Sequence, residues 1–366
     1  MKTVLFITNI PAPYRIDFYN ELGKYVNLTV LFEAKGASDQ GIKFNWNYDE
    51  ISNFKSVFLS NGDIREKKVN WKIIDFLRKN RFDHIVVTSY SYFTEMAALI
   101  YLKIMKIPYY METDGGIIRN ENRFKKWYKT FLITGAKGYF SPSAQSDTYL
   151  EYYGAKQNVV FRYPFTSFRK SDILEKVLDY NEKTKIRYTL GIKGEKVILG
   201  VGQMIYRKGW DILIKAAAQL DERFHVYIAG GNPTQEYLDL MNKLNVTEKV
   251  HFIPFSSSSL LTQYYRAADL FVLPTREDIW GLVVNEALAN GLPVITTNNC
   301  VAGLELIHNN VNGRIIDVDS VQQLVSGINE LIFGSNSYNL SKASLASIQM
   351  HTIEEMAKVH FNVFGS

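Results

Sequence analysis

The sequence predicts an α/β protein made of two Rossmann-like domains, each built around a parallel sheet. Its 366 residues exceed what one ordinary hydrophobic core organises, so two domains of comparable size are expected. Short apolar runs alternate with helical patterns along the chain, as in parallel sheets joined by crossover helices. With 46% hydrophobic and 22% charged residues, the composition is that of a folded globular protein.

The expected strands are short runs rich in Val, Ile and Phe, with polar turn residues at their ends. This pattern is typical of strands that are covered on both faces. In the first half of the chain they lie at residues 3–7, 28–32, 84–88, 108–112 and 138–141. In the second half they lie at residues 196–201, 225–229, 250–253, 270–273 and 293–296.

The boundary between the domains is expected within residues 164–177, because PFTSFRKSDIL has no clear period and leads into a new helix. We therefore assign residues 1–168 to the N-terminal domain and residues 169–350 to the C-terminal domain. Residues 351–366, HTIEEMAKVHFNVFGS, read as an amphipathic helix. We expect this helix to join the N-terminal domain.

The cysteine content and the charge limit the class of protein. The single cysteine, Cys300, can form neither an internal disulfide nor a thiolate metal cage, which argues against an extracellular disulfide-stapled scaffold. The apolar start reads as a buried strand rather than a signal peptide, and no run approaches the about 18 apolar residues of a membrane span. The net charge of +5 does not require a nucleic-acid partner. A cytoplasmic protein is expected.

A glycine-containing turn with two cations follows the first strand of the C-terminal domain. In VILGVGQMIYRKGW, Gly200 and Gly202 precede Arg207 and Lys208, and a helix follows near Trp210. Glycines let the backbone approach a diphosphate, cations neutralise its charge, and a helix N-terminus favours anions. The turn matches neither a Walker loop nor a full dinucleotide fingerprint, so an ordinary strand-to-helix loop with surface cations is the alternative.

The next informative segment is REDIWGLVVNEALANGLPVITTNN at residues 276–299. It places three carboxylates around an apolar helical run. Asp278 and Glu286 are eight positions apart, which places one at the mouth of a helix and the other two turns in. Together with Glu277 they could bond the hydroxyl groups of a ligand. The alternative is that acids at a helix start are simple caps.

Several of these segments together resemble the donor-site motifs of family-four retaining glycosyltransferases, which have the GT-B fold. The resemblance rests on RKG at 207–209, AADLFVLPT at 267–275 and DIWGLVVNEALANGLPVI at 278–295. It extends more weakly to NIPAPYR at 9–15 and GYFSPSAQSDTYLEYYGA at 138–155. The resemblance implies two Rossmann-like domains that face each other across a cleft, with the acceptor on the N-terminal domain and the donor on the C-terminal one.

The resemblance also implies roles for individual residues. Arg207 and Lys208 would hold the donor diphosphate, Glu286 would bond the ribose, and Asp278 would contact the transferred sugar. The sequence departs from the family at Asp278, where a glutamate is usual and Glu277 is a substitute, and at Gln203, where an arginine is common. The predicted donor-binding residues are Gly202, Gln203, Glu277, Asp278, Ile279, Trp280, Gly281, Leu282 and Glu286.

The N-terminal domain departs further from the family. In METDGG, Asp114 stands where many relatives have a histidine near the acceptor and the reacting carbon. Asp114 could orient the acceptor hydroxyl, or it could be a turn residue before two glycines. We predict Lys208, Arg207 and Asp114 as catalytic residues, and Tyr14 and Arg15, which follow the first strand, as acceptor-binding residues.

The segment RNENRFKKWYKTF at residues 119–131 interleaves cations with aromatic residues. Phe124, Trp127, Tyr128 and Phe131 recur at helical spacing. Such a stripe beside cations could lie on an anionic membrane. The alternative is that the stripe faces the protein core and that only its basic edge is solvated.

These observations and the resemblance predict a metal-independent retaining glycosyltransferase without a cofactor. It would move a hexose from a nucleotide diphosphate sugar, with UDP favoured, to a saccharide or lipid-linked acceptor in bacterial surface polysaccharide synthesis, namely capsule, exopolysaccharide or O-antigen. Its place would be the cytoplasm, with peripheral contact at the inner face of the membrane, and no nucleic acid is expected as a partner. A non-transferring protein of the same fold, such as a UDP-sugar epimerase or a sugar-nucleotide sensor, is the alternative.

Overall fold

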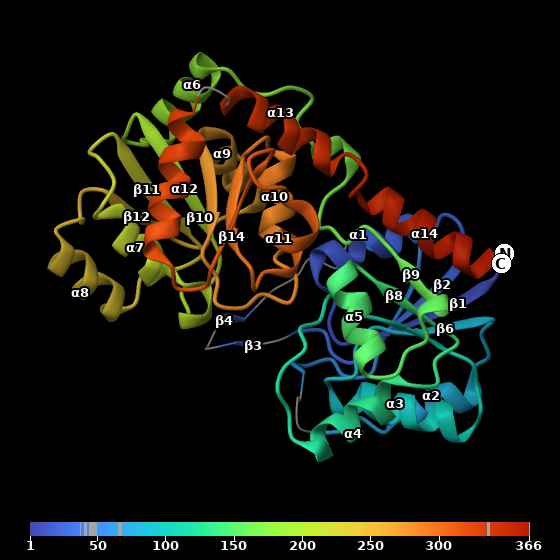
Figure 1. The fold of residues 1–366 in the computed structure, drawn as a ribbon. Coiled ribbons are helices and arrows are strands. Elements are labelled where there is room, and N and C mark those ends of the chain that lie inside the picture. Colours follow the sequence, from blue (N-terminus) through green and yellow to red (C-terminus); the bar gives the residue numbers. More distant parts are fainter. Residues whose placement is uncertain (37, 40–41, 44–49, 65–67, 335–336, 366) are drawn as a thin grey trace. The chain divides into compact units, whose positions relative to one another are not determined.

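The computed structural model describes residues 1–36, 38–39, 42–43, 50–64, 68–334 and 337–365 (Figure 1). The chain divides into two compact units. The first comprises Met1–Ser167 with His351–Ser366, and the second comprises Phe168–Met350. Within the described ranges, every helix is too short or too polar to cross a bilayer.

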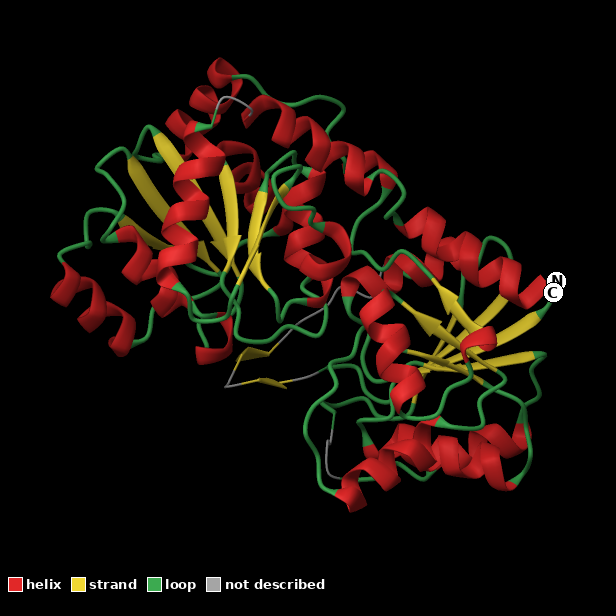
Figure 2. Ribbon diagram, in the orientation of Figure 1, coloured by secondary structure: helices red, strands yellow, loops and turns green. Residues whose placement is uncertain are grey.

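The first unit is built on a seven-stranded sheet whose strands are all parallel (Figure 2). In spatial order the strands are β5 (Lys55–Phe58), β2 (Asn27–Phe32), β1 (Thr3–Thr8), β6 (His84–Val87), β7 (Tyr110–Glu112), β8 (Gly138–Ser141) and β9 (Val160–Arg162). A separate antiparallel pair is formed by β3 (Ser38–Asp39) and β4 (Ile42–Lys43).

Helices cover both faces of this sheet because side chains of successive strand residues point to opposite sides. From β1, Leu5 and Ile7 join an aliphatic core, whereas Phe6 packs edge-on against Phe18 and Phe364 on the other face. The helices of the unit are α1 (Pro13–Leu22), α2 (Lys72–Lys79), α3 (Phe93–Ile104), α4 (Arg123–Ile133), α5 (Ala144–Tyr152), α14 (Ile353–Gly365) and the 3-10 turn η1 (Gln157–Val159). Helices α1 and α14 share the aromatic face, and α2 and α3 pack against the aliphatic one.

The second unit contains a six-stranded parallel sheet. Its spatial order is β12 (Val250–Ile253), β11 (Phe224–Ala229), β10 (Lys196–Val201), β13 (Leu270–Leu273), β14 (Val294–Thr297) and β15 (Gly313–Ile316). Its helices are α6 (Tyr180–Leu190), α7 (Trp210–Ala217), α8 (Gln235–Leu244), α9 (Ser258–Ala267), α10 (Leu282–Ala289), α11 (Val301–Leu306), α12 (Val321–Phe333) and α13 (Ser337–Ile348), with 3-10 turns η2 (Lys170–Asp172) and η3 (Tyr206–Lys208).

The predicted fold class, two Rossmann-like α/β units, is confirmed, and each predicted strand is present. Three predicted starts differ by one residue, and the strand predicted from residue 108 begins two residues later, at Tyr110. Pro108 has no backbone N–H to donate to the ladder. The sequence did not reveal β5, β9 and β15, which lie at the sheet edges and are only partly buried, so they lack a continuous apolar run. The predicted cleft between facing sheets stays a prediction.

Candidate functional site

Three loops of the second unit meet where strands β10, β11 and β13 end. Gly202 follows β10 with a φ of 153°, and a Cβ there would lie 3.2 Å from the Cε atom of Lys208. A Cβ on Gly230, after β11, would lie 2.3 Å from the carbonyl oxygen of Gly202. Gly209, with a φ of 73°, approaches Pro274 so closely that a Cβ would lie 2.0 Å from its carbonyl oxygen. Only glycine fits such backbone contacts.

A nearly buried ion pair joins two of these loops. The Nζ atom of Lys208 lies 2.6 Å from Oδ2 of Asp278, and the two residues are only 9% and 7% exposed. Arg207 donates from Nη1 to the carbonyl oxygen of Glu277 at 2.7 Å, and its side chain is 42% exposed. Lys208 is therefore a fixed, nearly buried cation among these loops, whereas the side chain of Arg207 is exposed to solvent.

Helix α10 starts beside this ion pair without a side-chain cap. Its N-cap is Gly281, with a φ of 101°, so the acids before it do not act as caps. A Cβ on Gly281 would lie 2.9 Å from Sγ of the buried Cys300, which explains why a glycine stands there. Free N–H groups at a helix start attract anions.

Two further contacts hold the predicted donor-site residues in place. The hydroxyl of Tyr265 donates to Oε2 of Glu286 at 3.0 Å, and the indole of Trp210 donates to the carbonyl oxygen of Gln203 at 2.9 Å. Trp280 is buried and donates to Asn285, whereas Ile279 is exposed and Leu282 is half-buried. The predicted donor residues thus lie together, in the loops after β10 and β13 and in the first two turns of α10. Their binding roles stay predictions.

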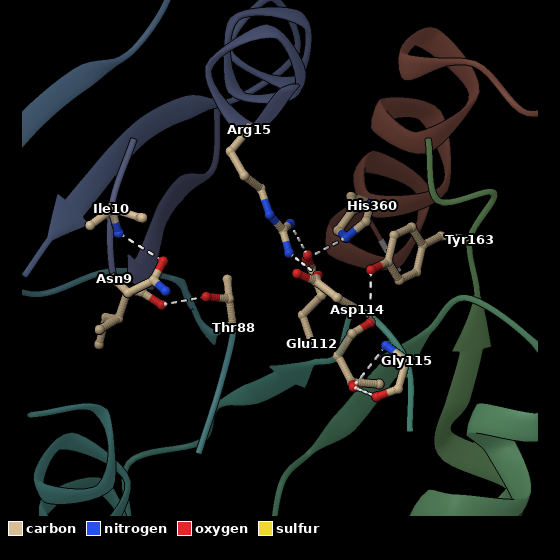
Figure 3. Close-up of polar contacts among 11 residues, drawn as sticks. Asn9, Ile10, Arg15, Thr88, Glu112, Asp114, Gly115, Tyr163 and His360 are labelled. Atoms are coloured by element: carbon tan, nitrogen blue, oxygen red, sulfur yellow. Dashed lines mark hydrogen bonds and ion pairs between the residues drawn. The ribbon is translucent and has the colours of Figure 1, made fainter. Parts of the chain in front are cut away.

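A cluster of charged residues forms at the carboxyl end of β7 in the first unit (Figure 3). Arg15, on the first turn of α1, makes ion pairs with Glu112 and Asp114, and His360 of α14 contacts Glu112 at 3.0 Å. Burial alone would raise the pKa of Glu112, but Arg15 and His360 outweigh it and lower that pKa to about 2. Glu112 is therefore ionised and fixed.

Asp114 is the more exposed carboxylate of this cluster, with a third of its side chain accessible. Desolvation raises the pKa of Asp114, which Arg15 opposes and Glu112 reinforces. Its loop is held by the hydroxyl of Tyr163, which donates to the Thr113 carbonyl oxygen at 2.9 Å. Asp114 is thus a carboxylate held by an arginine rather than only a turn residue.

The predicted acceptor residues Tyr14 and Arg15 lie beside Asp114, but they differ in exposure. The ring centroid of Tyr14 lies 5.6 Å from the Cζ atom of Arg15, and Tyr14 is half-buried. Arg15 is buried, and its guanidinium forms ion pairs with Glu112 and Asp114. Sequence reasoning missed Glu112 and His360, because 248 positions separate them and only the return of α14 brings them together.

Two buried glutamates at the same end of this sheet were also missed. Glu33 follows β2 and accepts a hydrogen bond from Thr94 at 2.6 Å. Its Oε2 atom and both carboxyl oxygens of Glu95 are buried without a hydrogen-bond partner among the described residues. Burial raises the pKa of Glu95 to about 8, so Glu95 is protonated at neutral pH. A polar cavity of about 460 Å³ opens beside Glu33. An acid directly after a buried strand was the available sequence signal.

The predicted aromatic stripe of residues 119–131 lies on α4 and points largely outward. Phe124 is 73% exposed, Trp127 61% and Phe131 42%. The rings form a row, with centroids 5.9 Å and 6.2 Å apart. The alternative of a core-facing stripe is therefore wrong for these three residues, and only Tyr128 turns inward, toward Met96.

No group of three or more His, Cys, Asp or Glu side chains in the described ranges could hold a metal ion. Metal independence stays a prediction.

Comparisons with known proteins give three findings. Residues 182–342 match the family model described as glycosyl transferases group 1. An uncharacterized glycosyltransferase of Methanocaldococcus jannaschii is 32% identical over 194 residues, which cover 51% of this chain and 49% of the relative. An uncharacterized glycosyltransferase of Haemophilus influenzae is 30% identical over 148 residues, which cover 41% of the relative, so the chain spans half or less of the length of these two curated relatives.

Solved structures share the fold over nearly the whole chain. The Anabaena protein HepE, in complex with UDP, has a TM-score of 0.76 at 18% identity and covers 99% of this chain and 98% of its own. WaaG, a glycosyltransferase involved in lipopolysaccharide biosynthesis, has a TM-score of 0.70 at 16% identity, with 99% of each chain covered.

Proposed function

We propose that the chain, whose residues 182–342 match the family model of the group 1 glycosyl transferases as the resemblance predicted, is a retaining glycosyltransferase. It moves a hexose from a UDP-sugar to a saccharide or lipid-linked saccharide acceptor. The UDP bound to HepE supports the choice of nucleotide, and the role of WaaG supports a place in bacterial surface polysaccharide synthesis.

One observation carries the proposal: the Lys208–Asp278 pair beside a glycine turn and the uncapped start of α10. A diphosphate placed there would meet a fixed cation, free N–H groups and the exposed charge of Arg207. Asp278 holds the ammonium in position before the donor arrives and contacts the sugar afterwards. Glu286, oriented by Tyr265, bonds the ribose hydroxyls.

The reaction needs no protein base. The bond between the anomeric carbon and the diphosphate oxygen breaks, and its electron pair leaves with UDP. The acceptor oxygen bonds the same carbon from the side that UDP leaves, and its proton passes to the departing phosphate oxygen. Negative charge grows on the diphosphate in the transition state, so preorganised cations accelerate the step. Lys208 and Arg207 supply that charge without requiring a metal ion or another cofactor.

In the N-terminal unit we assign acceptor binding to Asp114 and Tyr14. Asp114 accepts a hydrogen bond from the acceptor hydroxyl and so orients it. Arg15 is a positioning residue, because its buried guanidinium holds Asp114 and Glu112.

Peripheral membrane contact belongs to the same proposal. Helix α4 presents exposed Phe124, Trp127 and Phe131 beside Arg123 and Lys125, which are also exposed. Aromatic and cationic side chains on one helix suit the interface of an anionic bilayer. We place this contact at the cytoplasmic face of the membrane, where a lipid-linked acceptor is reached.

The function is tested by UDP release with candidate acceptors. A transferase releases UDP only when an acceptor is present, and NMR of the product from an α-linked UDP-hexose shows an α-linkage. Conversion of the UDP-sugar without an acceptor would instead indicate an epimerase. A β-linked product would reject the retaining mechanism.

A further inference from the structure

An apolar groove of about 450 Å³ lies between α2 and α3 in the first unit. Its walls include Trp71 at the start of α2, Phe93, Met96, Ala97 and Ile104 from α3, and Tyr128 from α4. Its volume falls in the range of about 300–1,000 Å³ typical of small-molecule sites. The aromatic row of α4 does not line this groove, so the groove is a separate feature.

The groove is open to solvent although its walls are hydrophobic. Trp71 is 69% exposed, Ile104 72% and Phe93 42%. A contiguous exposed apolar patch on a folded domain marks a site of contact with a ligand, a protein or a membrane. The hydroxyl of Tyr128 is directed to the sulfur of Met96 at 3.0 Å, within the walls. The lining thus suits a hydrocarbon rather than a sugar.

Lysines stand close in sequence to two lining residues of the groove. Lys72 directly follows Trp71 at the start of α2, Lys106 comes two positions after Ile104 at the end of α3, and both lysines are exposed. Lys103 lies 4.7 Å above the ring of Phe131 and bonds its carbonyl oxygen, which joins α3 to the aromatic row. The positive charges complement the phosphates of anionic lipids, whereas neutral or cationic surfaces would gain nothing from them.

We propose that this groove holds one hydrocarbon chain of a lipid from the anionic bilayer on which α4 docks. The inference rests on the membrane contact in the proposed function and extends it from surface contact to chain capture. Burying apolar surface is favourable, so a captured chain would hold the unit on the membrane more firmly than α4 alone.

Chain capture is tested with 11-(dansylamino)undecanoate below its micellar concentration. We expect saturable, blue-shifted dansyl emission with the wild-type protein. Ala97→Phe fills the groove and should weaken binding at least tenfold. Ala346→Phe, which adds the same ring to an exposed position on α13 of the other unit, should leave it unchanged. Ile104→Ser removes an exposed wall without touching the core and should weaken binding several-fold even if Ala97→Phe misfolds.

Non-saturable emission, or equal affinity in all four proteins, would overturn the proposal. A second arm separates capture from docking by sedimentation with phosphatidylglycerol vesicles. Phe124→Ser with Trp127→Ser should abolish sedimentation and keep probe binding, whereas Tyr188→Ser on the other unit should change neither. If the protein bound the probe but was not stabilised by UDP, the proposal for the groove would stand and the assignment of the donor site would be rejected.

Discussion

Lys208 and Asp278 come from loops 70 positions apart in the sequence, yet their side chains form an ion pair of 2.6 Å that is almost closed to solvent. Two glycines leave room for the Lys208 loop, because a Cβ at Gly202 would crowd the side chain of Lys208 and a Cβ at Gly209 would collide with the backbone of Pro274. The pair is the structural centre of the proposed donor site.

Lys208→Ala should reduce turnover about a hundredfold to a thousandfold, or about 3 to 4 kcal/mol, because a preorganised charge on the leaving group is lost. The change also leaves Asp278 with only its longer, 3.8 Å ion pair to Arg207, which destabilises a nearly buried carboxylate. The double variant Lys208→Ala with Asp278→Asn removes that charge, so it should recover the lost stability without recovering turnover. Steady-state kinetics that give near-normal turnover for Lys208→Ala would contradict the role.

Glu286→Gln should weaken the binding of UDP and of the UDP-sugar by the same factor, since the ribose is common to both. The expected loss is about 1.5–3 kcal/mol, as for hydrogen bonds to a charged group. Tyr265→Phe, which removes only the contact to Glu286, is the control and should have a smaller effect. Calorimetric titration measures both affinities, and a change confined to the acceptor would show that Glu286 has another role.

Asp114→Asn should lower kcat/KM for the acceptor about tenfold to a hundredfold, the equivalent of one charge-assisted hydrogen bond. UDP affinity should not change, because the assigned donor residues all lie in the other unit. Arg15→Lys, which retains a charge but loses the fork that spans Glu112 and Asp114, should give a smaller loss of the same kind. Equal losses of UDP affinity and acceptor turnover would refute the positioning role.

Glu95→Gln should stabilise the protein above neutral pH. Burial raises the folded-state pKa of Glu95 to about 8, above its ordinary value of 4.5, so the unfolded chain loses this proton first as the pH rises. Between these values the group lowers the free energy of unfolding by up to about 1.4 kcal/mol per pH unit, and glutamine does not. Denaturant titrations at pH 6 and pH 8 measure the free energy of unfolding of both proteins. If the difference between Glu95→Gln and the wild type were the same at the two pH values, the buried, protonated state of Glu95 would be contradicted.

The sequence was sufficient to predict the strands whose two faces are both buried. Central strands such as β1 and β10 are continuous apolar runs, whereas the edge strands β5, β9 and β15 are half-exposed and lack that signal. The donor-site residues were found because they lie in two short segments with a family resemblance. Their ion pair was not foreseen, since sequence spacing does not tell which loops meet.

The N-terminal unit was harder to read for physical reasons. Periodicity showed that the aromatic residues of α4 share a face, but not whether another element covers that face. Arg15 and Asp114 were both predicted, yet Glu112, which fixes Arg15, was not, because the last residue of a predicted strand gives no sign of which side chains it will meet. The buried acid Glu95 gave no signal within its helix.

The most direct test of the central claim is thermal denaturation of the protein with UDP, GDP and their sugar conjugates. A nucleotide at a hundred times its dissociation constant should add about 2.7 kcal/mol of stability. We predict that UDP and UDP-hexoses raise Tm, that GDP does so much less, and that Lys208→Ala reduces the shift. Absence of a shift with every nucleotide would contradict the assignment of the site.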